Sequence, residues 1–265
     1  MKIQKVEIND SVMEYIKFWT WKKVFVVIPW LSLKSVLLNP DFVTSAFSKY
    51  IDDFTVYLFD RLKVVPEGYS IYDMADDTYN AMSKVWISSC NIFWASQWWM
   101  IAQCITVNHP DFVEKLVLWS TASKVESSAI NIFSERIELA KQNEILELIK
   151  SFVNVVYCDK TIKQFWEMII NSNLGASAEE VRKFIILTNS LLNFDIDDKL
   201  WNITTRSYVL WSKNDKIFRE EQFINLSDKL HSDLYLYDDF GHWVYDEAPD
   251  FRDKILDFLL TWKSS

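Results

Sequence analysis

The sequence predicts an α/β fold, with a doubly wound, mostly parallel sheet of eight strands and an inserted helical lid. Short uninterrupted apolar runs alternate with longer amphipathic segments, which is the pattern of buried parallel strands and their crossover helices. Over one stretch of the chain, helical patterns follow one another without a strand. The 265 residues, of which 50% are hydrophobic and 25% charged, are enough to form a sizeable globular core.

The first elements form a predicted hairpin at one edge of the sheet. Residues 2–8 and 12–18 alternate between polar and apolar side chains, and Asn9 and Asp10 form the turn. The buried strands are expected at residues 24–29, 54–59, 90–93, 115–118, 208–210 and 234–237. The helices between them are expected at residues 41–50, 73–84, 97–107, 220–230 and 249–262. This alternation predicts the doubly wound sheet.

The alternation stops between residues 123 and 203, where four helical patterns occur in series. No linker rich in Pro, Gly or Ser marks the edges of this stretch, which argues against an independent domain. We therefore expect an α/β core formed by residues 1–123 and 204–265, with a helical lid over residues 124–203. The predicted lining of the lid, which would suit an apolar acyl or alkyl group, is Phe133, Ile137, Phe152, Phe165, Met168 and Phe184.

Charge and cysteine content exclude several classes of protein. The net charge of −9 disfavours binding to nucleic acid or to anionic membranes. Neither a run of about 20 apolar residues nor a signal-like apolar start occurs, so we expect a cytoplasmic protein without a membrane partner. The three cysteines, Cys90, Cys104 and Cys158, lack metal-binding spacing and are interpreted as buried thiols. The sequence predicts no oligomeric state.

A serine lies between a predicted buried strand and a predicted helix, in the segment Trp94-Ala95-Ser96-Gln97-Trp98. With glycine at positions 94 and 98 this segment would be G-x-S-x-G, the sharp turn that raises a nucleophilic serine above a sheet edge. Here the chain resembles the α/β-hydrolase fold family, and the resemblance extends over nearly the whole chain. It implies a serine hydrolase that needs no metal or organic cofactor and acts on a small molecule.

The resemblance also implies the remaining catalytic groups. Asp215, in the stretch Tyr208 to Phe218, matches the aspartate that follows a late strand in the family. His242, in Asp-Phe-Gly-His-Trp, matches the terminal histidine. Leu31 follows the third strand, where the family has its oxyanion loop, so the backbone N–H groups of Leu31 and Gln97 would be the oxyanion donors. The stretch Phe59-Asp60-Arg61 also fits the family pattern.

Glycine is scarce and tryptophan abundant. Average usage of about 7% predicts about 19 glycines in a chain of this length, whereas the sequence has 3 glycines and 13 tryptophans. Six tryptophans stand where the family usually has glycine: Trp30, Trp94, Trp98, Trp99, Trp119 and Trp211. Three more occur in turn-like contexts: Trp19, Trp21 and Trp86. Our hypothesis is that one codon has been read as tryptophan instead of glycine.

Two other functions stay open. If tryptophan does flank Ser96, the chain is better interpreted as a non-catalytic protein of the same fold that binds a ligand or a partner, because an indole at the elbow would distort a strained turn. A nucleotide-binding doubly wound domain is disfavoured, because no glycine-rich phosphate loop follows the first strands. Asp195, Asp197 and Asp198 could serve as a metal cluster, but a charged loop explains them more simply.

Overall fold

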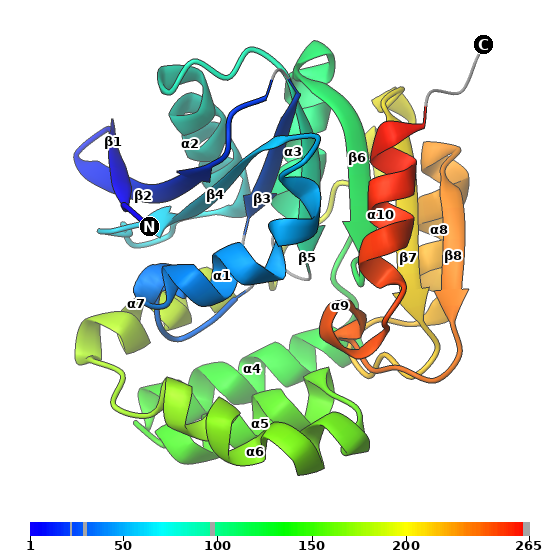
Figure 1. The fold of residues 1–265 in the computed structure, drawn as a ribbon. Helices are drawn as coiled ribbons and strands as arrows, with labels where there is room; N and C mark the ends of the chain where they lie inside the picture. The colour runs from blue at the N-terminus through cyan, green and yellow to red at the C-terminus, as the bar shows by residue number, and fades with distance from the viewer. Residues whose placement is uncertain (22, 29–30, 96–98, 262–265) are drawn as a thin grey trace.

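A computed structural model describes residues 1–21, 23–28, 31–95 and 99–261 of the chain (Figure 1). One sheet holds eight strands in the spatial order β1-β2-β4-β3-β5-β6-β7-β8. Their bounds are β1 (Gln4–Ile8), β2 (Ser11–Phe18), β3 (Val24–Ile28), β4 (Thr55–Leu62), β5 (Cys90–Ala95), β6 (Val113–Trp119), β7 (Arg206–Ser212) and β8 (Asp233–Tyr237). β2 pairs antiparallel with β1 and with β4, and all other pairs are parallel. The predicted eight-stranded, mostly parallel α/β fold is confirmed.

The hairpin and the central strands form for the reasons that their sequences suggest. Ile8 pairs with Ser11, and Asn9 adopts a φ of 51° in the turn between them. Asparagine tolerates this left-handed region because its short side chain bonds locally. β3, β4, β5 and β6 lie inside the sheet, and nearly all of their described side chains are buried, as expected for strands covered on both faces.

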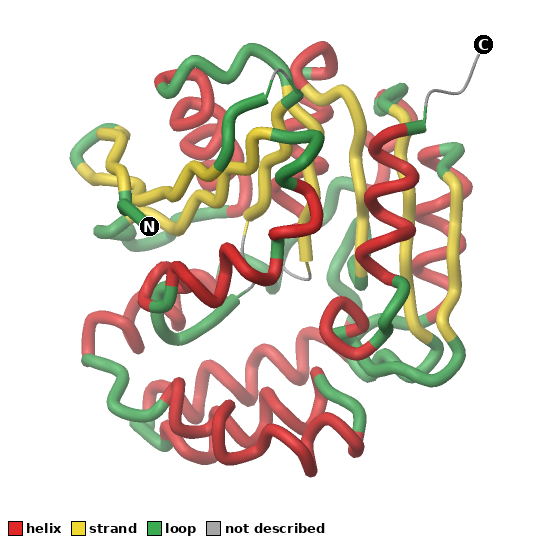
Figure 2. Tube along the Cα trace, viewed as in Figure 1, coloured by secondary structure: helices red, strands yellow, loops and turns green. Residues whose placement is uncertain are grey.

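Helices cover both faces of the sheet and one end of it (Figures 1 and 2). Their bounds are α1 (Pro40–Ala46), α2 (Ile71–Lys84), α3 (Trp99–Asn108), α4 (Ser127–Lys141), α5 (Ile145–Val156), α6 (Asp159–Asn173), α7 (Ala178–Asn189), α8 (Glu220–Leu230), α9 (Val244–Glu247) and α10 (Phe251–Leu260). In Figure 1, α1 and α10 lie in front of the sheet, and α2, α3 and α8 lie behind it. The sheet is therefore covered as a doubly wound fold requires.

The helix expected over residues 41–50 is interrupted. α1 begins after Asn39, whose side chain accepts a hydrogen bond from the Phe42 N–H at 3.2 Å, and it ends at Ala46. Phe47 leaves helical geometry with φ −104° and ψ 11°, and its ring is buried in the core. A short 3₁₀ turn, Ser48–Tyr50, follows. Burial of the Phe47 and Tyr50 rings outweighs one continued helical turn.

Helices α4 to α7 occupy the chain between β6 and β7 and lie across one end of the sheet (Figure 1). The two ends of this insert meet: Lys124 pairs with Asp195, and the Ile196 N–H donates to the Ser123 carbonyl at 3.0 Å. The chain therefore leaves the core and returns to it at one place. That these helices act as a lid stays a prediction. Among the described residues, no helix has the length and apolarity needed to cross a membrane.

Candidate active site

The carboxyl ends of the parallel strands meet at one edge of the sheet. Ile28 of β3 pairs with Trp94 of β5, and Ser212 of β7 pairs with Tyr237 of β8. The chain winds from β3 outward to β4 on one side, and from β5 outward to β8 on the other. The order therefore reverses between β3 and β5, and ligands of open α/β sheets bind beyond the carboxyl ends at such a switch point.

Asp215 and His242 are brought together at this edge from two different loops. The His242 Nδ1 atom lies 2.8 Å from Asp215 Oδ2, and the two side chains are 1% and 0% exposed. The other carboxylate oxygen, Oδ1, accepts the N–H groups of Ile217 at 2.8 Å and Phe218 at 3.1 Å. Because both oxygens have fixed partners, the carboxylate can hold only one orientation of the imidazole.

The two loops that carry this pair are tied to each other. Asp215 follows β7, and its N–H donates to the Ser212 carbonyl at 3.0 Å. The Ser212 hydroxyl donates to the Phe240 carbonyl, two residues before His242. The Lys213 N–H donates to the Tyr237 carbonyl at 2.9 Å. The geometry of the pair is thus set by the ends of β7 and β8.

The loop that carries His242 is also fixed against the helical insert. Glu247 accepts the N–H of Gly241 at 2.8 Å and the N–H of Cys158 at 2.8 Å, with one carboxylate oxygen each. The Trp243 N–H donates to the Val156 carbonyl at 3.0 Å. A Cβ atom at Gly241 would lie 3.0 Å from the Cys158 nitrogen, so a side chain here would need the backbone at Val156–Cys158 to shift by a few tenths of an ångström.

Ser96 and Gln97, the predicted nucleophile and one oxyanion donor, lie outside the described residues, as do Trp30 and Trp98. The elements around them are as the elbow requires. β5 ends at Ala95 and α3 begins at Trp99, which leaves three residues for the connection. Leu31, the other predicted donor, follows β3 and is buried. Both segments therefore begin at the edge where Asp215 and His242 meet.

A cavity of about 530 Å³ lies between the loop after β3, helix α1 and the insert helices α5 and α6. Leu31 and Trp243 belong to its wall, which connects it with the candidate site. Four of the six side chains proposed for the lid lining belong to it: Phe152, Phe165, Met168 and Phe184. Phe133 and Ile137 of α4 do not, because α4 packs against α5 and α7 and buries both side chains there.

Sequence reasoning missed part of this wall. Trp243 and Asp246 line the cavity, and the indole Nε1–H of Trp243 donates to Asp246 Oδ2 at 2.6 Å. Burial raises the pKa of Asp246, although Trp243 and Arg252 act in the opposite direction. On α5 the wall is formed by Leu148, Ile149, Phe152 and Val153. Their spacing marks one helical face, a signal that could have identified them.

The acidic residues near the end of the insert serve a structural role. Asp197 accepts the hydroxyl of Ser123, the amide of Asn225 and the ammonium of Lys229. These contacts join the insert stem to α8. Among the described residues, no group of three or more His, Cys, Asp or Glu side chains could hold a metal ion.

The sequence and the fold were both compared with those of known proteins. No model of a protein family matches the sequence. Two proteins with the name "Putative carbamate hydrolase RutD" are similar in sequence. The one from Rhizobium rhizogenes is 24% identical over 199 residues, which are 74% of this chain and 76% of that protein. The one from Agrobacterium fabrum is 26% identical over 200 residues, covering 74% and 77%.

Three solved structures are similar over almost their full length. MGS-M2, an α/β-hydrolase from a Medee basin deep-sea metagenome library, has a TM-score of 0.86 at 18% identity and covers 99% of each chain. The enol-lactonase of Burkholderia xenovorans LB400 has a TM-score of 0.83 at 15% identity, covering 97% and 100%. An esterase of Thermogutta terrifontis has a TM-score of 0.80 at 16% identity, covering 98% of each. The chain therefore has the α/β-hydrolase fold that its sequence resemblance predicts.

Proposed function

We propose that the chain is a serine hydrolase that cleaves an ester or related acyl bond of a small, apolar substrate through an acyl-serine intermediate. The observation that carries the proposal is the buried Asp215–His242 pair, at the edge where the connection containing Ser96 leaves β5. Relatives and structural neighbours named carbamate hydrolase, enol-lactonase and esterase support hydrolysis as the class of reaction.

The proposed reaction has two halves. The Ser96 hydroxyl attacks the carbonyl carbon of the substrate while His242 accepts its proton, and Asp215 stabilises the imidazolium. The N–H groups of Leu31 and Gln97 stabilise the oxyanion, an effect of about 3 kcal/mol for each donor. The intermediate expels its alcohol or amine, which takes the proton from His242. Water then attacks the acyl-serine by the same route, and the acid leaves.

The cavity supports an apolar acyl or alkyl group as the part of the substrate that binds beside the serine. Its wall carries phenylalanines and aliphatic side chains from α1, α5 and α6, and its volume of about 530 Å³ is within the range of small-molecule sites. The proposal requires no metal and no organic cofactor. The helical insert supplies most of this wall, which supports its interpretation as a substrate lid.

A second candidate function is favoured by one observation. Trp94, Trp98 and Trp99 surround Ser96 in the sequence, where an elbow needs residues without a large side chain. A chain with these tryptophans would bind a ligand or partner through the same cavity without hydrolysing it.

The test is labelling with a fluorophosphonate probe, followed by peptide mass spectrometry. The hydrolase proposal predicts an adduct on Ser96 that His242→Ala and Ser96→Ala abolish. A folded chain that shows no adduct on Ser96 supports the binding function instead. Lys229→Met, which removes a structural contact to Asp197, is the control and should be labelled like the parent.

A further inference from the structure

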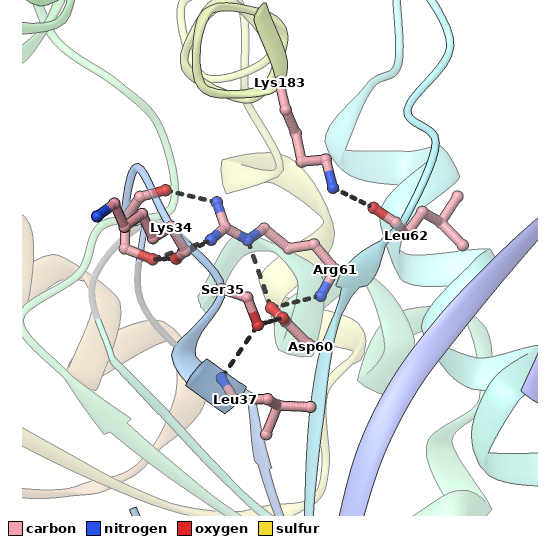
Figure 3. A network of polar contacts seen from close by, with 8 residues as sticks. Lys34, Ser35, Leu37, Asp60, Arg61, Leu62 and Lys183 are labelled. Carbon is pink, nitrogen blue, oxygen red and sulfur yellow. Dashed lines mark hydrogen bonds and ion pairs between the residues drawn. The ribbon is translucent and has the colours of Figure 1, made fainter. Parts of the chain in front are cut away.

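The loop that follows β3 is held by an arginine from the neighbouring strand (Figure 3). Arg61 lies near the end of β4, and its guanidinium donates to the Ser32 carbonyl at 2.7 Å, the Ser32 hydroxyl at 2.9 Å and the Lys34 carbonyl at 2.8 Å. All three acceptors belong to loop 31–35, between β3 and a 3₁₀ turn at Val36–Leu38. One planar side chain therefore fixes the backbone of the loop at two residues.

The arginine has a buried counter-ion that holds the other end of the loop. Asp60 and Arg61 side chains are 7% and 6% exposed, and Asp60 Oδ1 lies 3.6 Å from Arg61 Nε. Asp60 also accepts the Ser35 hydroxyl, and that hydroxyl accepts the Leu37 N–H at 3.1 Å. Burial lowers the pKa of Arg61, while the Asp60 carboxylate opposes this shift. The loop is thus fixed at both of its ends by one ion pair.

A separate contact ties the same loop to the helical insert. The Lys34 ammonium donates to the Leu174 carbonyl at 2.5 Å, at the end of α6. Leu31, Ser32 and Leu33 line the cavity of about 530 Å³. The position of this backbone therefore decides where the Leu31 N–H lies relative to a substrate in the cavity.

We propose that Arg61 is a positioning residue, which holds loop 31–35 so that the Leu31 N–H can act as an oxyanion donor. This proposal rests on the proposed function. Arg61 does not line the cavity, and its effect is transmitted through the carbonyl groups of Ser32 and Lys34. The hydrogen bond from Ser35 to Asp60 also helps to hold loop 31–35 in place.

The test combines amide hydrogen exchange with the rate of fluorophosphonate labelling. Arg61→Met removes all three donors, and Arg61→Lys keeps a charge beside Asp60 but cannot reach the three acceptors together. Lys183→Met is the control, because the Lys183 ammonium donates to the carbonyl of Leu62, the β4 residue after Arg61, at 2.9 Å, and no hydrogen bond joins it to loop 31–35 in the described part of the chain. Both arginine variants should exchange the amides of loop 31–35 faster and react about 10- to 100-fold more slowly at Ser96.

The outcomes separate the two proposals. Unchanged exchange in folded Arg61 variants overturns the positioning role, and so does faster exchange with an unchanged labelling rate. A chain that forms no adduct on Ser96, either as the parent or with glycine at positions 30, 94, 98 and 99, is a failure of the proposed function, and amide exchange then still decides whether Arg61 holds the loop. Melting temperatures identify any variant that has lost its fold.

Two tryptophans, Trp86 and Trp19, occupy a helix end and a turn where the backbone is left-handed. Helix α2 ends in a Schellman motif, in which the Ile87 N–H donates to the Met82 carbonyl at 3.1 Å and the Trp86 N–H to the Ser83 carbonyl at 3.1 Å. Trp86 is the left-handed residue of this motif, with φ 67°, and its side chain is 93% exposed. This conformation is strained for a tryptophan, and the exposed indole gains almost no burial in return.

Trp19 has the same geometry at another turn. It follows β2 with φ 66°, and its side chain is 56% exposed. Trp21, which the sequence also placed in this group, does not share the feature: it lacks a positive φ, and its Nε1–H donates to the Ile51 carbonyl at 2.7 Å. Left-handed backbone therefore occurs at two of the three turn tryptophans.

The buried tryptophans differ in whether their indole N–H groups are hydrogen-bonded. Trp119 and Trp211, at positions where the family has glycine, are buried, and their indole N–H groups have no hydrogen-bond partner in the described part of the chain. Trp243, which is outside that group, is equally buried and donates to Asp246. Buried indole N–H groups are ordinarily paired.

We infer that the cell that makes this protein inserts glycine at positions 19, 86, 119 and 211, by reading as glycine a codon that is written here as tryptophan. The same reading would place glycine at positions 94 and 98 beside Ser96. Peptide mass spectrometry of the protein purified from its own cells tests this. Glycine at 86 and 119 with tryptophan at 201 and 243 is the expected result, and tryptophan at 86 overturns the inference.

Discussion

One helix of the α/β core, α2, and one helix of the helical insert, α4, end with the same backbone geometry but with different residues. In the core, α2 is followed by Trp86 at φ 67°. In the insert, α4 is followed by Asn143 at φ 58° and α6 by Gly175 at φ 72°. Asparagine and glycine adopt this region at low cost, whereas a bulky side chain does not. The same turn is therefore ordinary at the end of α4 and strained at the end of α2.

Helices α2 and α4 both end in a Schellman motif, so Trp86 and Asn143 occupy equivalent positions. The Glu144 N–H donates to the Leu139 carbonyl at 2.9 Å, and the Asn143 N–H to the Ala140 carbonyl at 3.1 Å, which matches the two bonds at the end of α2. Hydrogen bonding thus imposes one conformation at both sites, whatever the side chain. Strain at Trp86 is a property of the residue and not of the fold.

The largest expected effect is on the labelling rate of Ser96, when the tryptophans of the elbow and of the oxyanion loop are replaced with glycine. Replacing Trp30, Trp94, Trp98 and Trp99 together with glycine should raise the rate of fluorophosphonate labelling at Ser96 by about 100-fold or more, which corresponds to about 2.7 kcal/mol. The reason is that the elbow and the oxyanion loop then reach their catalytic backbone geometry. Trp201→Gly, at an exposed site beyond the insert helices, should leave the rate unchanged. Equal rates in all variants would contradict the glycine hypothesis at the site.

The next largest effect is on stability, at Gly241, which is a glycine in the sequence of the core. Gly241→Ala should destabilise the protein by about 1–3 kcal/mol, because the new Cβ would lie 3.0 Å from backbone atoms of Val156 and Cys158. Labelling at Ser96 should also slow, since the displaced residue precedes His242. Chemical denaturation and labelling rates measure the two effects. Gly68→Ala is no matched control, because Gly68 is left-handed with φ 72° and Gly241 is not. Asp239→Ala, at an exposed residue of the same loop, is the control and should keep the stability of the parent. A Gly241→Ala variant as stable as the parent would argue against the close approach.

A tryptophan placed at a left-handed position of the insert should destabilise the protein, as we infer for Trp86 in the core. Gly175→Trp should lower the free energy of unfolding by about 1–2 kcal/mol, because the left-handed backbone is unfavourable for a residue with a Cβ. No atom lies within 4 Å of a Cβ at this position, so the cost is conformational and not steric. Urea denaturation gives the value. A neutral change would show that the insert adapts its turn.

The converse change should relieve the core. Trp86→Gly is expected to stabilise the protein by about 1–2 kcal/mol, since it removes the strain at φ 67° and gives up almost no burial. Trp201→Gly is the matched control, because Trp201 is also exposed but lacks a positive φ. It should not stabilise the protein. Loss of stability in Trp86→Gly would mean that the indole makes a contact that its exposure conceals.

The smallest expected change in stability is at Asn143, the left-handed residue that follows α4. Asn143→Gly should change the free energy of unfolding by less than about 0.5 kcal/mol, because asparagine already tolerates the left-handed region. Measured beside Trp86→Gly under the same conditions, it sharpens the contrast between the two helix ends. A gain as large as that at position 86 would show that the strain is not specific to tryptophan.

Much of the fold could be predicted from local pattern. The hairpin turn at Asn9, the central strands and the ends of α8 follow from periodicity and turn residues, which act over a few positions of the chain. The order of Asp215 and His242 along the chain also follows from the sequence, and the parallel strands bring the two side chains to one edge. Ser96 and Gln97 lie outside the described residues, so their role stays a prediction.

The amino-acid pattern alone was enough to predict the alternation of strands and helices, the place of the insert and the residues that carry chemical groups. The folded structure was needed to show that Phe133 and Ile137 are buried away from the cavity, and that Trp243 lines it. It also decided that Arg61 holds loop 31–35 and that Glu247 joins Gly241 to Cys158. The physical reason is that these contacts join segments far apart in the chain. Their partners depend on how each helix is rotated and how each loop approaches the sheet, which local periodicity does not specify.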